Sequence, residues 1–292
     1  MFQASTRALL IGPVIAAGVF LAGCGAAQEP GSGAGSAAPA AGAGSAAPVA
    51  AGAAAPVAGP GEAVAAGSAI ISDLGAAVDP ATLPAGALYR NPANGRDEVI
   101  VGNIANTALL IGDSQSEPQG SWPRRALAGL GYEVFFCGKG GTGFVASNGS
   151  TGNYVDALQR GDWHLPYGFP PLVLIEGGGN DAKQGASDEQ ISANADRLIT
   201  TIKQRYPGAK LAMVGTLGKG TEHGGVRRAE VDALLGTVAA DHGIPFVSVG
   251  DWLTRYGLES QLKDSVHMKS DGHRALGVLL GDRLARLGLA LS

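Results

Sequence analysis

The sequence has few of the residues that indicate a disulfide-stapled, membrane-spanning or nucleic-acid-binding protein. It contains only two cysteines, Cys24 and Cys137, in 292 residues, so its folded part must rely on a hydrophobic core. Its apolar stretch from Leu9 to Leu21 is too short to span a bilayer comfortably. The formal net charge is -4 and no Lys/Arg cluster stands out. This charge balance argues against nucleic acid, and also against an acidic polymer, as a partner.

The N-terminus has the features of a processing signal. Arg7 supplies a positive charge before the apolar stretch, and small residues follow it. Leu21-Ala22-Gly23-Cys24 resembles a bacterial lipobox, in which the cysteine receives a diacylglycerol and becomes the first residue after cleavage. The resemblance implies a signal peptide over 1–23 and a protein held at the cell envelope, outside the cytoplasm, by a lipid anchor on Cys24. An ordinary secretory signal that contains a cysteine is the alternative.

A low-complexity segment follows the predicted anchor. From Gly25 to about Gly75 nearly all residues are Ala, Gly, Pro and Ser, and Gly-Ser-Ala-Ala-Pro occurs at both 35–39 and 44–48. Such a composition cannot bury enough surface to offset the entropy lost on ordering, and its Pro and Gly argue against a helical rod. We therefore expect 24–80 to be a disordered tether and 81–292 to form one folded domain.

Beyond Pro80, apolar runs alternate with amphipathic stretches, which predicts a parallel sheet covered by helices. The predicted strands are Ala108 to Ile111, Glu133 to Cys137, Leu172 to Glu176, Lys210 to Val214 and Pro245 to Val249. The predicted helices are Trp122 to Leu130, Asp188 to Tyr206, with Asp188 as its N-cap, Arg227 to His242 and Gly272 to Leu287. This order predicts a three-layer α/β/α sandwich, flavodoxin-like, with a five-stranded parallel sheet.

Ligands of such open sheets bind beyond the carboxyl ends of the strands. Three short segments of glycines and polar residues follow three of the predicted strands, so we expect them to meet at one edge: Gly112-Asp113-Ser114-Gln115-Ser116, Gly138-Lys139-Gly140-Gly141-Thr142-Gly143 and Gly177-Gly178-Gly179-Asn180-Asp181. Ser114 would leave a buried strand through a tight turn before a helix, whose N-terminus presents N–H groups toward the site. Alone, Gly-Asp-Ser is equally consistent with an ordinary strand-ending turn.

Four motifs in order resemble those of the SGNH, or GDSL-type, hydrolase family. Gly112–Ser116 resembles the first block, the glycine loop around Gly141 the second, Gly178-Gly179-Asn180-Asp181 the third and Asp264-Ser265-Val266-His267 the fifth. The matches cover about residues 105–287. The resemblance implies the flavodoxin-like fold of that family and an esterase or related acyl-transfer activity that uses no metal and no organic cofactor.

The resemblance also implies a role for each matched residue. Ser114 is expected to be the nucleophile, His267 its base, and Asp264 the residue that orients the base. The backbone N–H groups of Ser114 and Gly141 and the side-chain amide of Asn180 are expected to form the oxyanion hole. The spacing of the acid and the base is sensible, because residues three apart on one loop can meet in a tight turn.

Two of these assignments have alternatives. The second block lacks the Asn or Asp often found before its glycines, which leaves four possible donors, of which we take Gly141: Gly138, Gly140, Gly141 and Gly143. A flexible turn or a phosphate cradle is the other interpretation of this loop, although no Gly-Lys-Ser/Thr ending supports a nucleotide site. Asn180 and Asp181 could simply cap a turn, but their place after a third strand favours the oxyanion hole.

Other polar and aromatic residues of the domain lie outside the four motifs. Asp264, His267, Asp271 and His273 are ligand types that zinc accepts, but no second cluster supports a metal and none is expected. His273 is expected to pack or cap at the start of the last helix. Five rings are expected either to line the substrate cleft or to pack over the sheet: Tyr154, Trp163, His164, Tyr167 and Phe169.

The favoured function is therefore a serine-dependent hydrolase that removes acyl groups, short ones such as acetyl, from a glycan, a lipid or a small ester near the envelope. An O-acyltransferase with the same Ser-His-Asp residues is the first alternative, because its first half-reaction is identical. A catalytically silent binding lipoprotein is the second. Nothing in the sequence points to an oligomeric state.

Overall fold

The computed structural model describes residues 78–292. The predicted signal peptide over 1–23, the predicted lipidation site Cys24 and nearly all of the predicted tether over 24–80 lie outside these residues. Within 78–292, no helix is both long enough and apolar enough to cross a membrane.

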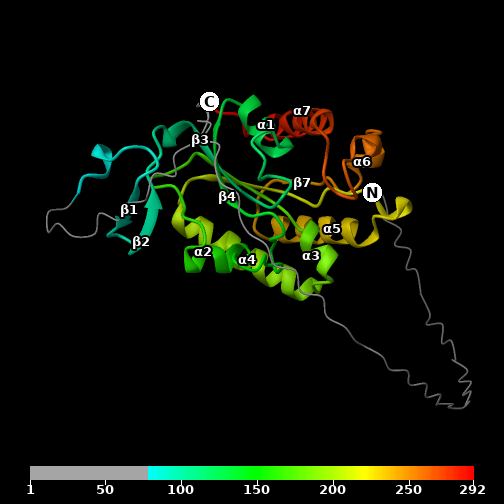
Figure 1. The fold of residues 1–292 in the computed structure, drawn as a ribbon, viewed down its shortest axis with the longest axis horizontal. Helices are drawn as coiled ribbons and strands as arrows, with labels where there is room; N and C mark the ends of the chain where they lie inside the picture. The colour runs from blue at the N-terminus through cyan, green and yellow to red at the C-terminus, as the bar shows by residue number, and fades with distance from the viewer. Residues whose placement is uncertain (1–77) are drawn as a thin grey trace, which may run out of the picture. The chain divides into compact units, whose positions relative to one another are not determined.

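Five parallel strands form the central sheet in the order β4-β3-β5-β6-β7 (Figure 1). Their bounds are β3 Thr107–Gly112, β4 Glu133–Gly138, β5 Leu172–Glu176, β6 Lys210–Val214 and β7 Phe246–Val247. Every residue of β3 and β5 is buried, because helices cover both faces of the sheet. The chain leaves β3 for one side of the sheet and then crosses to the other, so the carboxyl end of β3 is a topological switch point.

Helices cover the two faces of this sheet (Figure 1). One core contains apolar residues of α1, α6 and α7, and the other contains those of α2, α4 and α5. The helix bounds are α1 Trp122–Gly129, α2 Tyr154–Arg160, α3 Gly179–Gln184, α4 Asp188–Arg205, α5 Val226–Asp241, α6 Trp252–Arg255 and α7 Ser270–Arg286. Short 3-10 helices lie at Pro80–Thr82, Ile104–Asn106, Thr221–His223 and Glu259–Gln261. The predicted three-layer α/β/α sandwich with five parallel strands is confirmed.

Several predicted boundaries shift. Ser187, and not Asp188, is the N-cap of α4: its hydroxyl accepts the N–H of Gln190, whose side chain accepts the N–H of Ser187 in return. Asp188 is instead the first helical residue. The last helix begins at Ser270, two residues before the predicted start, and β7 contains two residues of the five predicted.

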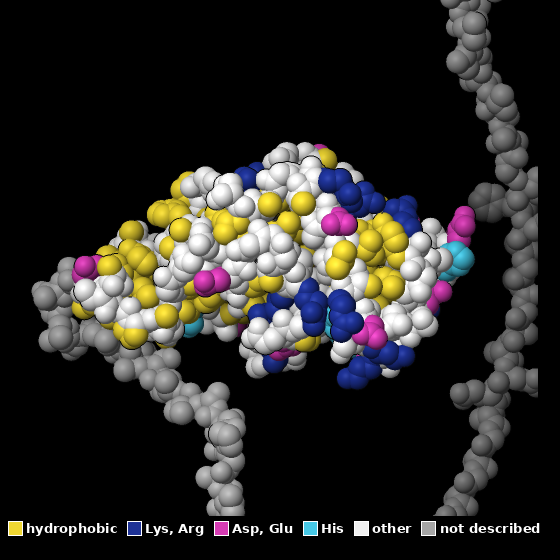
Figure 2. Space-filling view, turned by 90° about the horizontal axis from the view of Figure 1, so that it is seen from above, with side chains coloured by type: hydrophobic (Ala, Val, Ile, Leu, Met, Phe, Trp, Pro, Cys, Tyr) yellow, Lys and Arg dark blue, Asp and Glu magenta, His cyan; other side chains and the backbone are white. Residues whose placement is uncertain are grey.

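The structure also contains elements that the periodicity did not reveal, among them α2, α3, α6 and an antiparallel hairpin of β1 Leu88–Asn91 and β2 Arg96–Val99. The hairpin is tied to the sandwich by the N–H of Val99, which donates to the carbonyl of Leu165. A buried ion pair between Glu98 of β2 and Arg205 of α4 also holds it in place. On the side of the molecule where α1 and α7 lie, Lys and Arg side chains are interspersed with Asp and Glu (Figure 2).

Candidate active site

Ser114, His267 and Asp264 lie in a chain of hydrogen bonds, although the serine is more than 140 residues away from the other two. Nε2 of His267 lies 2.9 Å from Oγ of Ser114, and Nδ1 of the same ring lies 2.8 Å from Oδ2 of Asp264. When Nδ1 carries the proton and donates it to the carboxylate, Nε2 is free to accept the proton of the serine hydroxyl. This arrangement can make Ser114 nucleophilic.

The loop that carries the acid and the base is internally fixed. Oδ1 of Asp264 accepts the backbone N–H groups of Val266 at 2.9 Å and His267 at 2.8 Å, while Oδ2 faces the imidazole. These backbone hydrogen bonds, followed by the one to the His267 ring, hold the pKa of the Asp264 carboxyl well below its usual range. Asp264 therefore stays ionised and keeps the imidazole in one orientation.

The turn after β3 places Ser114 at the carboxyl edge of the sheet. Oδ1 of Asp113 accepts the N–H of Gln115 at 2.8 Å, which closes a tight turn around the serine. Gly112 is required here, because a Cβ at this position would lie 2.6 Å from Oγ of Ser116. The side chain of Gln115 then donates to the carbonyl of Val266 at 2.8 Å, and so ties the serine turn to the loop of the base.

The second glycine loop lies beside this turn. The N–H of Gly140 donates to the carboxylate of Glu117, and the N–H of Gly143 donates to a carbonyl in its own loop. Among the described residues, no acceptor is bound by the N–H of Gly141 or by that of Ser114, and both residues line the same cavity. Of the candidate donors, this geometry favours Gly141.

Asp181 and Asn180, the last two residues of the third motif, have different surroundings. Asp181 is fully buried, and its carboxylate accepts the backbone N–H groups of Phe144, Val145 and Ala146, which fixes the second glycine loop. Asn180 lines the cavity, where its Nδ2 donates to Oδ2 of Asp113 at 3.0 Å and to the carbonyl of Thr142 at 2.9 Å. To donate to an oxyanion as well, Asn180 must share one of these two N–H bonds with the substrate.

Two buried carboxyl groups lie beneath Ser114. Burial raises the pKa of Asp113 to about 6, and burial together with the charge of Asp113 raises the pKa of Glu176 well above its ordinary value. Oγ of Ser116 donates to Glu176 at 2.7 Å. Glu176 belongs to none of the four motifs, although a carboxylate at the end of an otherwise apolar strand is a visible signal in the sequence.

A cavity of about 350 Å³ opens onto these groups. Its lining includes Ser114, His267, Gly141 and Asn180 together with charged residues that the sequence did not single out: Glu176, Lys183 and Arg228. The three glycine-containing segments and the acid–base loop thus meet at the carboxyl edge of the sheet, as the topology predicted.

The other candidate residues lie elsewhere or play structural parts. His273 is in the first turn of α7, where its Nδ1 accepts the N–H of Trp122 at the start of α1. Asp271 pairs with Arg274 at the surface. Within residues 78–292, no three His, Cys, Asp or Glu side chains are grouped so that they could hold a metal ion. Cys137 is buried, and burial raises the pKa of its thiol far above the ordinary value.

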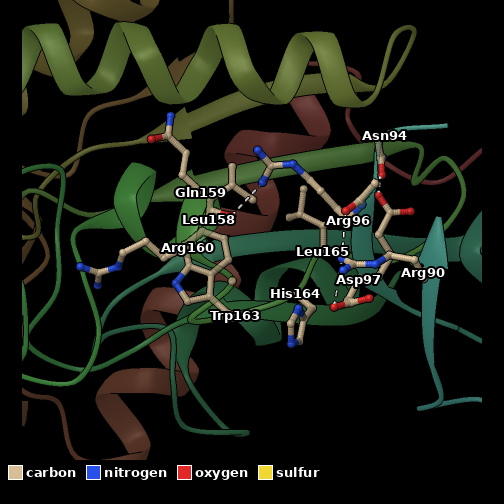
Figure 3. Close-up of a pocket in the computed structure, with 13 residues that line it drawn as sticks. Arg90, Asn94, Arg96, Asp97, Leu158, Gln159, Arg160, Trp163, His164 and Leu165 are labelled. Atoms are coloured by element: carbon tan, nitrogen blue, oxygen red, sulfur yellow. Dashed lines mark hydrogen bonds and ion pairs between the residues drawn. The ribbon is translucent and has the colours of Figure 1, made fainter. Parts of the chain in front are cut away.

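The stretch rich in aromatic residues does not line the Ser114 cavity. Trp163 and His164 line a different hollow, of about 420 Å³, between the β1–β2 hairpin and the end of α2, and no residue is common to both linings (Figure 3). The hydroxyl of Tyr154 donates to the carbonyl of Glu176 in the core, and Tyr167 packs edge-to-face on Tyr89. Phe169 is exposed, so two of the five residues pack, two line the other hollow, and none lines the cavity around Ser114.

A family model described as GDSL-like Lipase/Acylhydrolase family matches residues 107–275. Among curated proteins, no match to the sequence was found. Solved structures do match. A family two carbohydrate esterase from Cellvibrio japonicus is 15% identical with a TM-score of 0.51, and 68% of this chain and 66% of that chain are covered.

Two further structures have lower TM-scores. An active-site mutant of a family two carbohydrate esterase from Clostridium thermocellum, in complex with a cello-oligosaccharide, is 16% identical with a TM-score of 0.47, covering 63% of this chain and 64% of that one. An aryl esterase from M. smegmatis is 20% identical with a TM-score of 0.46, covering 63% and 100%. The chain thus spans slightly less than two thirds of the length of the two carbohydrate esterases.

Proposed function

Because this chain belongs to the GDSL-like lipase/acylhydrolase family, we propose that it hydrolyses ester bonds, with Ser114 as nucleophile, His267 as base and Asp264 as the residue that orients the base. The family predicted from the four motifs is confirmed by the match over 107–275. The observation that carries the assignment of roles is the continuous path from Oγ of Ser114 through the His267 ring to the ionised Asp264.

The reaction follows from this path. Oγ of Ser114 attacks the ester carbonyl while its proton moves to Nε2 of His267, and the carbonyl oxygen becomes an oxyanion. The N–H groups of Ser114 and Gly141 are free to donate to that oxyanion, with Asn180 as the third donor. His267 then protonates the leaving alcohol, which leaves an acyl-serine. A water molecule, whose proton passes to His267, attacks this acyl-serine. The carboxylic acid is released and the proton returns to Oγ of Ser114.

The location that we propose is the cell envelope, outside the cytoplasm. It is supported by the lipobox-like Leu21-Ala22-Gly23-Cys24, which would attach a lipid to Cys24, and by the Ala/Gly/Pro/Ser composition of 24–80, which suits a tether between membrane and enzyme. The substrate we propose is an acyl ester, carried by a glycan, a lipid or a small molecule.

A fluorophosphonate probe tests the nucleophile, since it reacts with activated serines. We expect the wild-type protein and a variant of an exposed serine outside the cavity, Ser260→Ala, to be labelled, and Ser114→Ala to remain unlabelled. Unlabelled wild-type protein would favour a silent binding lipoprotein, and labelling of Ser114→Ala would remove Ser114 from the reaction. Product analysis with 4-nitrophenyl acetate, with and without a glycan acceptor, separates hydrolysis from acyl transfer, because an acyltransferase would yield an acetylated glycan.

A further inference from the structure

The guanidinium group of Arg228 lies in the wall of the Ser114 cavity, directly over Gly179. A Cβ built on Gly179 would lie 2.8 Å from Nη1 and 2.9 Å from Nη2 of Arg228, so the guanidinium occupies the space that a side chain at 179 would take. Nη1 also donates to the carbonyl of Leu217 at 2.8 Å. Arg228 is thus held one residue away from Asn180, beside the proposed oxyanion hole.

Arg228 forms no ion pair within the described part of the chain, although the charges of Asp113 and Glu176 act on it. Its neighbour Arg227 pairs with Asp188 and Glu230, whereas the bond to Leu217 is the one hydrogen bond that the Arg228 side chain makes within residues 78–292. The side chain is half-buried, and burial lowers its pKa from the ordinary value of an arginine. A partly buried cation without an ion pair is costly, because it has lost water without gaining an anion in return.

The two carboxyl groups in the same cavity do not fill this role. Asp113 accepts hydrogen bonds from Gln115 and Asn180, and Glu176 accepts one from Ser116, but neither forms an ion pair with Arg228. Their raised pKa values mean that both retain protons more readily than exposed carboxyl groups do. Arg228 attracts both carboxyl groups and partly offsets the effect of burial on their pKa values, but it makes no hydrogen bond to them, so its remaining N–H groups can donate to an anion that enters the cavity.

Lys183 adds a second cation on the same side of the cavity. It lies in α3, three residues after Asn180, and it lines the cavity without an ion pair among residues 78–292. The formal net charge of -4 does not reveal this local positive pair.

We propose that Arg228, assisted by Lys183, selects esters that carry a carboxylate close to the ester bond. This inference rests on the proposed function, because it specifies the substrate of that same site. The planar guanidinium can donate two parallel hydrogen bonds to a carboxylate, and its fixed place beside Asn180 sets the distance between the carboxylate and the reacting carbonyl. The proposed ligand is a small ester with a single carboxylate. It is not the acidic polymer against which the net charge argues.

Matched pairs of esters test the proposal. Mono-4-nitrophenyl succinate and 4-nitrophenyl butyrate compare a charged with a neutral acyl group, and 4-acetoxybenzoate and its methyl ester make the same comparison for the alcohol. In at least one of these two pairs, we expect the wild-type kcat/KM to be at least about tenfold higher for the charged ester than for the neutral one. A charge-assisted hydrogen bond is strong enough to give such a ratio. That preference should weaken in 0.5 M salt.

Variants then assign the preference to its residue. Arg228→Gln should bring the ratio of the two kcat/KM values close to one, mainly by raising KM for the charged ester, while Arg228→Lys should keep part of the preference. Arg227→Gln, which removes a neighbouring arginine outside the cavity, is the matched control and should leave the ratio unchanged.

The outcomes separate this inference from the function on which it rests. Hydrolysis of the neutral esters without any preference in the wild-type protein overturns the role of Arg228 and leaves the esterase intact. A preference that persists in folded Arg228→Gln, as judged by its thermal melting, also overturns it. If the wild-type protein hydrolyses none of the four esters, the proposed function itself fails. Wild-type preference and its salt dependence decide the matter even if Arg228→Gln does not fold.

Discussion

The hydroxyl of Ser116 donates a 2.7 Å hydrogen bond to the buried carboxyl of Glu176, and so joins the turn that carries Ser114 to the end of the neighbouring strand β5. Glu176 is almost completely buried, and its carboxyl lies near that of Asp113. The position of the nucleophile therefore depends on a carboxyl group whose charged form is disfavoured by its surroundings.

This arrangement predicts how stability depends on pH. The pKa of Glu176 is raised in the folded protein, so the folded state binds its proton more tightly than the unfolded chain does. The stabilising contribution of Glu176 to folding is therefore present below the ordinary carboxyl pKa, and it is lost as the pH rises through the pKa of Glu176 in the folded protein. Glu176→Gln should therefore raise the free energy of unfolding relative to wild type more at pH 8 than at pH 5, as urea denaturation can measure. The exposed Glu222→Gln is the control, and an equal effect of Glu176→Gln at both pH values would contradict the prediction.

The second prediction concerns the hydrogen-bonded path from Ser114 to Asp264. Ser114→Ala and His267→Ala should each lower kcat by on the order of 10,000-fold or more, because either change disables the same proton-coupled attack. The double variant should be scarcely slower than either single one. Asp264→Asn should retain more activity, since it disturbs the orientation and tautomer of the base. Additive losses in the double variant, measured with one ester, would show that the two residues act independently.

The third prediction concerns Asn180. Asn180→Ala should lower kcat by on the order of 100-fold with little change in KM, because this donor acts mainly on the charge that develops in the transition state. Asn103→Ala, at the opposite edge of the sheet from Ser114, should have no such effect. A near-normal kcat for Asn180→Ala would mean that its amide serves only Asp113 and Thr142, the two acceptors it has in the structure.

The fourth prediction concerns Cys24. If this residue carries the lipid, Cys24→Ala should release the protein from the membrane fraction while its esterase activity per molecule stays the same. The measurement is the distribution of activity between membrane and soluble fractions of the producing bacterium. Unchanged retention of the variant would argue against a lipid at Cys24.

The fifth prediction concerns the tether. A chain that begins at Pro80 should unfold cooperatively and hydrolyse 4-nitrophenyl acetate at the rate of the longer protein, because every residue that lines the Ser114 cavity lies beyond it. Loss of cooperative unfolding would place the domain boundary nearer the N-terminus.

Elements with strong periodicity were predictable from the sequence, and elements that depend on distant contacts were not. The apolar run of β5 and the spacing of α4 are local signals, and both elements occur where expected. The β1–β2 hairpin is held in place by residues far along the chain, including Arg205, so no short window reveals it. The motif residues that resemble a known family were expected to meet, and the structure brings Ser114, His267 and Asp264 within hydrogen-bonding distance of one another. Arg228 belongs to no motif. Its place in the cavity depends on the space that Gly179 leaves by having no side chain, which no sequence window reveals.

The proposed nucleophile and its proposed base come from opposite ends of the domain's sequence. Ser114 follows the first strand of the sheet, whereas His267 comes just before α7, which packs against α1 through contacts such as that of His273 with Trp122. If His267 is the base, a growing chain has no base until α7 has been made and has docked. A cut at the exposed Gly257 would divide Ser114 from His267, and we expect each fragment to be inert by itself. Turnover thus measures whether the domain has been assembled to its end.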